Sequence, residues 1–221
     1  MSAPSVAIVT GAASGLGLEL AVRLAHEGPV VGVARTDPED QRWAASDCHF
    51  VRGDVADPDT VERAFGEAEA HGALSLVVNC AGRGVFGPAG TGSRAALDEV
   101  LAGNLVGLVL FSEAAFARFR ETGGTIVNVM STAAKTPRAN ESLYCAAKWG
   151  ARGYTESLRL DAAGSQARIV AVYPGGMRTR FWRRAEASHV DPARFMDPAD
   201  VAEAILAALP RGVSELVIAR C

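Results

Sequence analysis

The sequence lacks the marks of several protein classes. Its net charge is −3 over 221 residues, which favours neither nucleic acid nor an anionic membrane as a partner. Its longest apolar runs, such as Leu105–Phe111, are too short to span a bilayer. The N-terminus leads directly into Val6-Ala-Ile-Val-Thr10 without a basic region or a cleavage-site pattern, so we expect no signal peptide. It has no linker, internal repeat or low-complexity segment, and we expect a single domain over residues 1–221.

Cysteine and histidine are also sparse. The sequence has no Cys-x-x-Cys pair, which favours free thiols in a reducing cytoplasm over a disulfide frame or a zinc site; the cysteines are Cys48, Cys80, Cys145 and Cys221. The histidines are scattered along the chain, and we expect them on the surface; they are His26, His49, His71 and His189. Because no histidine or carboxylate spacing is typical of metal ligands, we expect no metal site.

Short β-branched runs alternate with longer helical patterns along the whole chain. The expected strands are Val6–Thr10, Val30–Ala34, Cys48–Arg52, Leu74–Asn79, Thr125–Met130, Arg168–Tyr173 and Glu215–Ala219. The expected helices are Gly15–Glu27, Asp57–His71, Ala95–Glu121, Ser142–Ala163 and Pro198–Leu209. Several strands are apolar on both faces, as in parallel sheets covered by helices on each side. The alternation predicts one doubly wound α/β domain with right-handed crossovers.

Three glycines follow the first expected strand, in Thr10-Gly-Ala-Ala-Ser-Gly-Leu-Gly17. Glycine lets the backbone turn sharply and approach a pyrophosphate, and the helix that follows offers free N–H groups to phosphate. A plain strand-to-helix turn is the alternative, but three glycines in this context favour phosphate binding. The second expected strand ends in Val33-Ala34-Arg35, where an acidic residue would favour NAD. Arg35 favours NADP(H) instead, unless it is simply a solvated surface arginine.

Tyr144 and Lys148 are four residues apart, and Ser131 lies thirteen residues before the tyrosine. Positions i and i+4 share one face of a helix, so a phenol and an ammonium are expected to project into the same space. A nearby cation lowers the pKa of a tyrosine, which makes the phenol a usable acid at neutral pH.

Together these residues resemble the compact, single-domain short-chain dehydrogenases/reductases, from about Val6 to Ile218. The resemblance rests on the glycine loop, on Asp54-Val55, on Asn79-Cys-Ala-Gly82, on Asn104, on the Ser131, Tyr144 and Lys148 triplet, and on Pro174-Gly-Gly-Met-Arg-Thr179. Cys80 departs from the family pattern, which has a second asparagine there. The cofactor-binding residues that the resemblance implies are Thr10, Gly11, Ser14, Gly15, Leu16, Gly17, Arg35, Asp54, Val55, Asn79, Ala81, Gly82, Tyr144, Lys148, Pro174, Gly175, Met177 and Thr179.

The resemblance implies a Rossmann-like three-layer α-β-α sandwich with a parallel sheet of about seven strands in the order 3-2-1-4-5-6-7. It implies hydride transfer between NADP(H), with NAD(H) as the alternative, and a small carbonyl or alcohol substrate. Tyr144 would be the general acid/base, Lys148 would lower its pKa and bind the nicotinamide ribose, and Ser131 would orient the substrate oxygen. Asn104 would anchor a water that connects Lys148 to solvent, and Thr179 with the backbone near Met177 would hold the carboxamide. The family also implies a homodimer through the two long helices, with a tetramer as the alternative.

The chain is short for this family, and the shortening is expected in the flap after Thr179 and at the C-terminus. The flap carries four arginines that fit an anionic or acyl-carrier-bound substrate, although the solvated face of a short helix is the preferred interpretation; they are Arg178, Arg180, Arg183 and Arg184. Substrate choice is expected to depend on Arg83, Phe86, Ala133, Arg138, Phe181 and Trp182. The alternatives are a 3-oxoacyl-thioester reductase, a non-catalytic NADP(H)-sensing regulator and a sugar-nucleotide epimerase, the last of which would need a longer C-terminal region.

Overall fold

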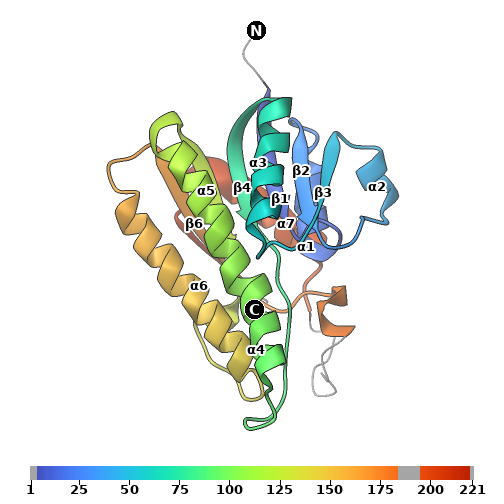
Figure 1. Cartoon of the computed structure of the whole chain (residues 1–221), viewed down its shortest axis with the longest axis vertical. Helices are drawn as coiled ribbons and strands as arrows, with labels where there is room; N and C mark the ends of the chain where they lie inside the picture. The colour runs from blue at the N-terminus through green and yellow to red at the C-terminus, as the bar shows by residue number, and fades with distance from the viewer. Residues whose placement is uncertain (1–3, 184–194, 220–221) are drawn as a thin grey trace.

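The computed structural model of the chain describes residues 4–183 and 195–219. Its centre is one parallel sheet in the order β3-β2-β1-β4-β5-β6-β7, which confirms the doubly wound topology (Figure 1). The strands are β1 (Ser5–Thr10), β2 (Val30–Ala34), β3 (Cys48–Arg52), β4 (Ala73–Asn79), β5 (Gly124–Val129), β6 (Ala167–Pro174) and β7 (Glu215–Ile218). Each lies within one residue of the strand expected from the sequence.

Helices cover both faces of the sheet and make it the middle layer of a sandwich. Helices α3 (Pro58–His71), α5 (Gly107–Thr122) and α6 (Ser142–Asp161) lie on one face, and α1 (Gly15–Leu24) and α7 (Pro198–Ala208) lie on the other (Figure 1). Because side chains alternate along a strand, β1 sends Ile8 to the core beneath α3 and α5, and Val9 to the core beneath α1 and α7. Both faces are therefore apolar, as the sequence indicated.

The expected helix Ala95–Glu121 is divided into three parts. Helix α4 (Arg94–Leu101) passes through a π-helical turn, η1 (Ala102–Val106), before α5 begins at Gly107. Single π-turns inside α-helices often mark functional sites, and this one contains the predicted Asn104.

The stretch Arg94–Thr122 has a mean hydropathy of 1.8 in its most apolar window and is long enough to cross a membrane by length and composition. In this structure it covers β4 and β5 and packs beside α6.

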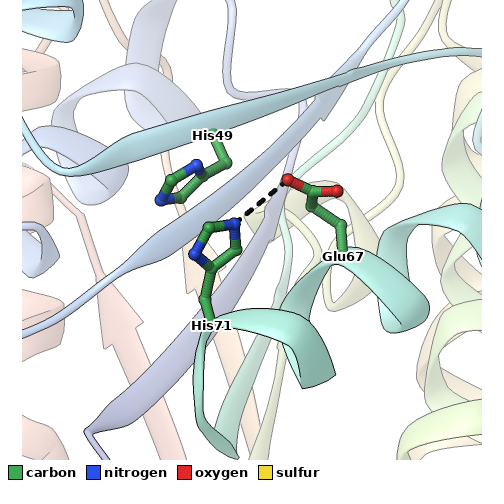
Figure 2. Close-up of side chains that lie close together, drawn as sticks. All are labelled: His49, Glu67 and His71. Carbon is green, nitrogen blue, oxygen red and sulfur yellow. Dashed lines mark hydrogen bonds and ion pairs between the residues drawn. The ribbon is translucent and has the colours of Figure 1, made fainter.

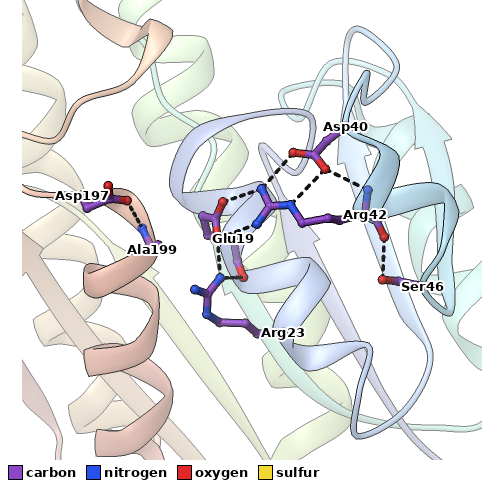
Figure 3. Close-up of polar contacts among 7 residues, drawn as sticks. All are labelled: Glu19, Arg23, Asp40, Arg42, Ser46, Asp197 and Ala199. Atoms are coloured by element: carbon purple, nitrogen blue, oxygen red, sulfur yellow. Dashed lines mark hydrogen bonds and ion pairs between the residues drawn. The ribbon is translucent and has the colours of Figure 1, made fainter.

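The short helix α2 (Gln41–Ala44) was not expected, and contacts from distant residues hold it. Asp40 caps its first turn by accepting a hydrogen bond from the Arg42 N–H. The Arg42 guanidinium then reaches Glu19 on α1, with 2.7 Å between Nη2 and Oε1 (Figure 3). Arg23 also contacts Glu19, and hydrogen bonds from Arg42 and Arg23 lower the pKa of this nearly buried carboxyl. The network ties the segment after Arg35 to α1.

Aspartates begin two of the expected helices, as the sequence indicated. Asp57 accepts a hydrogen bond from the Asp59 N–H at the start of α3. Asp197 does the same for the Ala199 N–H at the start of α7 (Figure 3). In both helices a proline fills the first helical position, where no N–H partner is needed.

Candidate active site

The carboxyl ends of β1, β2, β4, β5 and β6 border one cavity of about 410 Å³. Most of the predicted site residues line it: Gly11, Ser14, Gly15, Leu16, Gly17, Arg35, Asp54, Val55, Ala81, Gly82, Ser131, Tyr144, Lys148, Pro174, Gly175, Met177 and Thr179. Thr10, Asn79 and Asn104 lie behind the cavity wall instead. The topology explains this convergence, because ligands of open α/β sheets bind at the carboxyl ends of the strands.

The glycine loop is shaped by close backbone approaches. Gly11 has φ +72°, and a Cβ there would lie 2.8 Å from the Ala81 Cα atom. A Cβ on Gly17 would lie 2.4 Å from the Gly11 carbonyl oxygen. The loop leads into α1, and Ser14 at the N-cap position makes no side-chain capping hydrogen bond. The first residues of α1, Gly15, Leu16 and Gly17, line the cavity, and N–H groups of an uncapped first turn suit phosphate.

Thr10 and Asn79 hold the end of β4 behind the cavity. The buried Thr10 hydroxyl accepts hydrogen bonds from the backbone N–H groups of Cys80, at 3.0 Å, and Ala81, at 3.1 Å. Asn79 donates its amide to Ser112, at 2.9 Å, and to Asn128, at 2.8 Å, in the interior. Sequence reasoning placed both residues at the cofactor. In this structure their side chains fix the end of β4 rather than line the cavity.

Arg35 and Asp54 stand at the mouth of the cavity, after β2 and β3. Their closest charged atoms, Arg35 Nη1 and Asp54 Oδ2, are 4.0 Å apart, and both side chains are largely exposed. Asp54 also accepts a hydrogen bond from the Ala56 N–H at 2.9 Å, which fixes its orientation. An exposed ion pair at this distance contributes little stability, so the guanidinium can turn toward an anionic ligand.

Tyr144 and Lys148 both project from α6 and are buried at the base of the cavity. Lys148 Nζ lies 5.8 Å from the centroid of the Tyr144 ring and donates to the Val129 carbonyl at 3.4 Å. Burial raises the pKa of Tyr144, and a hydrogen bond with Ser131 opposes that rise. Burial lowers the pKa of Lys148 to about 8. The expected lowering of the Tyr144 pKa by Lys148 is not found in the protein alone, because burial dominates the Tyr144 pKa and the effects that oppose burial come from Ser131 and Arg138.

Ser131 and Asn104 are held by the backbone around the pair. Ser131 caps a short 3₁₀ turn by accepting the Ala133 N–H at 3.1 Å. Asn104 donates to the carbonyls of Arg83 and Val100, both at 2.8 Å. A Cβ on Gly82 would lie 3.0 Å from Asn104 Oδ1 and 3.6 Å from Lys148 Nζ, so the bare glycine brings the amide and the ammonium close together. The water route through Asn104 stays a prediction.

The segment after β6 closes the other side of the cavity. The Gly175 N–H donates to the Ile218 carbonyl at 2.8 Å, and Met177 pairs with Met196 in an isolated β-bridge. Thr179 faces the glycine loop, because a Cβ on Gly15 would lie 3.1 Å from its methyl carbon. The segment thus opposes the loop across the cavity.

Aromatic rings surround Tyr144 at the outer part of the cavity. Phe86 and Phe181 meet the Tyr144 ring edge to face, with centroids 5.5 and 5.7 Å away. Trp182 stacks on Phe86 with centroids 5.4 Å apart. Among the expected specificity residues, Arg83, Arg138, Phe181 and Trp182 line the cavity, Phe86 packs against it and Ala133 is buried beneath it.

Charged residues near the cavity pair with carboxylates of the same chain. Glu99 lines the cavity and forms an ion pair with Arg83. The flap arginines Arg178 and Arg180 pair with Asp197, at 2.8 Å, and Glu39, at 3.2 Å, and these side chains are exposed, in line with the preferred interpretation of a solvated face. Arg184 and His189 lie outside the described residues.

Three cysteines among the described residues, Cys48, Cys80 and Cys145, are free thiols. Cys80 lines the cavity, where the sequence departs from the family pattern. Burial raises the pKa of the Cys80 thiol to about 12, so it stays protonated and unreactive at neutral pH. Cys221 lies outside the described residues.

Comparison with known proteins gives a consistent result. A family model described as short chain dehydrogenase matches residues 5–189. The 2,5-dichloro-2,5-cyclohexadiene-1,4-diol dehydrogenase of Sphingobium indicum is 30% identical over 92% of this chain and 88% of its own length. The trans-4-hydroxycyclohexanecarboxylate dehydrogenase of Sinomonas cyclohexanicum is 32% identical over 80% of this chain and 74% of its own. A solved variant of actinorhodin polyketide ketoreductase with NADPH has a TM-score of 0.85 and 27% identity, covering 100% of this chain and 98% of that one.

Proposed function

This chain belongs to the short-chain dehydrogenase family, and we propose that it transfers hydride between NADP(H) and a ketone, an aldehyde or a secondary alcohol. The observation that carries the proposal is the convergence of Ser131, Tyr144 and Lys148 with the glycine loop on one cavity. Gly11 and Gly17 let the backbone of the loop pack closely on Ala81 and on the loop itself, where a Cβ would collide, and this tight turn between strand and helix is the form that a pyrophosphate site takes.

The chain's own residues supply binding, orientation and the proton. The N-terminus of α1 holds the phosphates, Lys148 the ribose, and Thr179 with the backbone near Met177 the carboxamide. The nicotinamide supplies the hydride. In reduction, the Ser131 hydroxyl orients the carbonyl oxygen and the Tyr144 phenol gives it a proton, and in oxidation Tyr144 takes the proton back. Because burial raises the Tyr144 pKa, the phenol stays protonated at neutral pH, which suits reduction.

Preference for NADP(H) over NAD(H) is proposed from Arg35. Its guanidinium stands at the cavity mouth at the end of β2, where an acidic side chain would repel a 2′-phosphate. The NADPH in the structural relative is consistent with this choice. We expect Arg35→Ser to raise the KM for NADPH about tenfold or more while changing that for NADH little. An equal change in both constants would remove the basis of the preference.

Substrates with an apolar ring fit this cavity best. Phe86, Phe181 and Trp182 present flat apolar surface around the proton donor. The relatives from Sphingobium and Sinomonas are named for six-membered-ring alcohols. An acyl-carrier-bound substrate is the alternative, because the exposed ion pairs of Arg178 and Arg180 contribute little and leave both guanidinium groups able to meet an anion. A cofactor-sensing regulator without turnover is less favoured, because the catalytic triplet is intact.

The test is a panel of cyclic and linear ketones with NADPH and NADH, followed at the reduced-nicotinamide absorbance. Tyr144→Phe is expected to abolish turnover and to leave NADPH binding nearly intact, as measured by fluorescence. Tyr154→Phe is the matched control, since Tyr154 bonds to Glu113 on the surface, away from the cavity lining. Full activity in Tyr144→Phe would rule out the proposed proton donor.

A homodimer through α4, η1, α5 and α6 is part of the proposal. Large apolar side chains of this region remain exposed in the single chain, including Val106, Trp149 and Leu160, whose exposed fractions are 40%, 45% and 77%. Covering such a surface with its own copy is the commonest solution among soluble oligomers.

A further inference from the structure

Two histidines that are distant in sequence meet at the opposite end of the sheet from the cavity. His49 is the second residue of edge strand β3, and His71 is the last residue of α3. Their rings stack with centroids 3.5 Å apart and an interplanar angle of 23°. The histidines lie at the surface as the sequence indicated, but these two are not scattered: α3 runs antiparallel to β3, and its last turn therefore lies beside the start of that strand.

A carboxylate completes the group. Glu67 precedes His71 by one helical turn, and its Oε1 atom lies 3.1 Å from His71 Nε2 (Figure 2). One nitrogen or oxygen atom from each of His49, Glu67 and His71 lies within 4.8 Å of the other two. All three side chains are partly exposed, so an ion can reach them from solvent.

We propose that His49, Glu67 and His71 bind a divalent transition-metal ion of the Zn²⁺ type. Two imidazoles and one carboxylate are donors that Zn²⁺ prefers, and a water would complete four-fold coordination. Two ligand atoms on one tetrahedral Zn²⁺ are about 3.3 Å apart, given bonds of about 2.0–2.1 Å. The pair Glu67 and His71 is already near that separation. Because imidazole lone pairs lie in the ring plane, metal binding requires the partly exposed His49 ring to turn out of its stack on His71 until its free nitrogen points at the same ion.

A second carboxylate supports the histidine from the strand. His49 Nε2 and Asp47 Oδ1 are 3.1 Å apart, so the ring N–H donates to the carboxylate and leaves the other nitrogen as a ligand. Histidine ligands commonly donate their second ring N–H to a carboxylate in this way, which fixes the tautomer and the ring orientation. The four side chains thus supply three ligands and one orienting group.

The role of this site is structural rather than catalytic. Helix α3 has 14 residues, so its last residue lies roughly 20 Å from its start beside Asp54 at the cavity. Strand β3 is the edge strand and pairs with β2 alone among the described strands. An ion bridging His49 and His71 would clamp that edge to the helix that covers it, which stabilises the folded state by RT ln(1 + [L]/Kd), where [L] is the free metal concentration.

The test is metal binding to tag-free protein that has been stripped with a chelator. Zn²⁺ titration by calorimetry is expected to give one equivalent bound, and Co²⁺ is expected to give the visible absorption of a tetrahedral ion. Zn²⁺ is also expected to raise the melting temperature. His49→Gln and His71→Gln should each weaken binding at least tenfold and remove the thermal shift.

Two control variants separate this site from other metal-binding groups. His26→Gln changes an exposed histidine after α1, and Cys48→Ser removes the neighbouring thiol; both should bind Zn²⁺ as the unmodified protein does. Glu67→Gln provides a third, exposed ligand variant if a histidine variant folds poorly. Unchanged Zn²⁺ affinity in the ligand variants, or loss in Cys48→Ser instead, would overturn the proposal.

Discussion

Lys148 shows how burial sets the chemistry of a single residue in this fold. Its side chain is 3% exposed, and burial lowers the pKa of its ammonium from 10.5 to about 8. The folded protein therefore binds the Lys148 proton less tightly than the unfolded chain does. Between pH 8 and 10.5 the unfolded chain carries more protons, so stability rises with pH across this window.

We therefore expect Lys148→Met to stabilise the cofactor-free protein while abolishing turnover. Lowering the pKa from 10.5 to about 8 corresponds to a gain on the order of 3 kcal/mol at pH 7. The gain should shrink as the pH rises from 8 toward 10.5, because the unmodified lysine then loses its charge in the folded state. Urea unfolding at several pH values measures the difference. A pH-independent gain in Lys148→Met would contradict the assignment.

Thr10 was predicted as a cofactor contact, and its structural role leads to a different prediction. Thr10→Val keeps the shape but leaves the N–H groups of Cys80 and Ala81 without their acceptor. Each lost partner costs about 1–3 kcal/mol where water cannot replace it. We expect a lower free energy of unfolding and weaker NADPH binding, measured by urea unfolding and fluorescence. Thr10→Ser keeps the hydroxyl and should behave like the unmodified protein; if it fails equally, the hydroxyl is not the cause.

At the scale of elements, the sequence predicts what local patterns determine. The strands were located to within one residue because β-branched runs between turn residues are a local signal. Helix α2 was missed because Glu19, 23 residues away, holds Arg42 in place. The π-turn around Asn104 was missed because its contacts are also non-local: the Asn104 amide exchanges hydrogen bonds with the backbone of Arg83, 21 residues earlier.

Replacing two helical glycines by alanine tests whether the close approach of α5 to the segment after β3 contributes to stability. A Cβ on Gly107, at the start of α5, would lie 2.4 Å from a Val55 side-chain carbon and 3.2 Å from its backbone. Gly66, on the exposed side of α3, has open space within 4 Å. We expect Gly107→Ala to destabilise the fold by about 1–3 kcal/mol through overpacking, and to weaken cofactor binding by moving Val55. Gly66→Ala should stabilise it by about 0.5–1 kcal/mol, since alanine is the better helix residue.

Thermal unfolding of the two variants, with NADPH affinity as the second measurement, distinguishes these effects. Equal changes in stability for both variants would mean that helix propensity, and not the approach of α5 to Val55, decides the cost at Gly107.

At the scale of the whole molecule, the sequence predicts the site residues that belong to family motifs with a fixed order and spacing along the chain. The glycine loop, Ser131, Tyr144 and Lys148 were all placed at the cavity that the structure describes. The pair Arg83 and Glu99, and the pair His49 and His71, could not be predicted, because sheet order and helix packing create them. Their partners are 16 and 22 residues apart, with no helical or strand period that links them.

The proposed dimer is tested at the same scale. The π-turn η1 packs on α6, and the exposed Val106 and Trp149 come from these two adjacent elements. A charge at Val106 would be buried without a partner if two copies pair through these elements, which costs several kcal/mol.

We expect sedimentation at micromolar concentration to give twice the chain mass of 23.0 kDa, and Val106→Glu to give the single chain. Val217→Glu, on edge strand β7 with an exposed fraction of 50%, should leave the dimer intact but would break a tetramer formed through that edge. A dimer that survives Val106→Glu and dissociates in Val217→Glu would place the interface on the sheet edge instead of the helices.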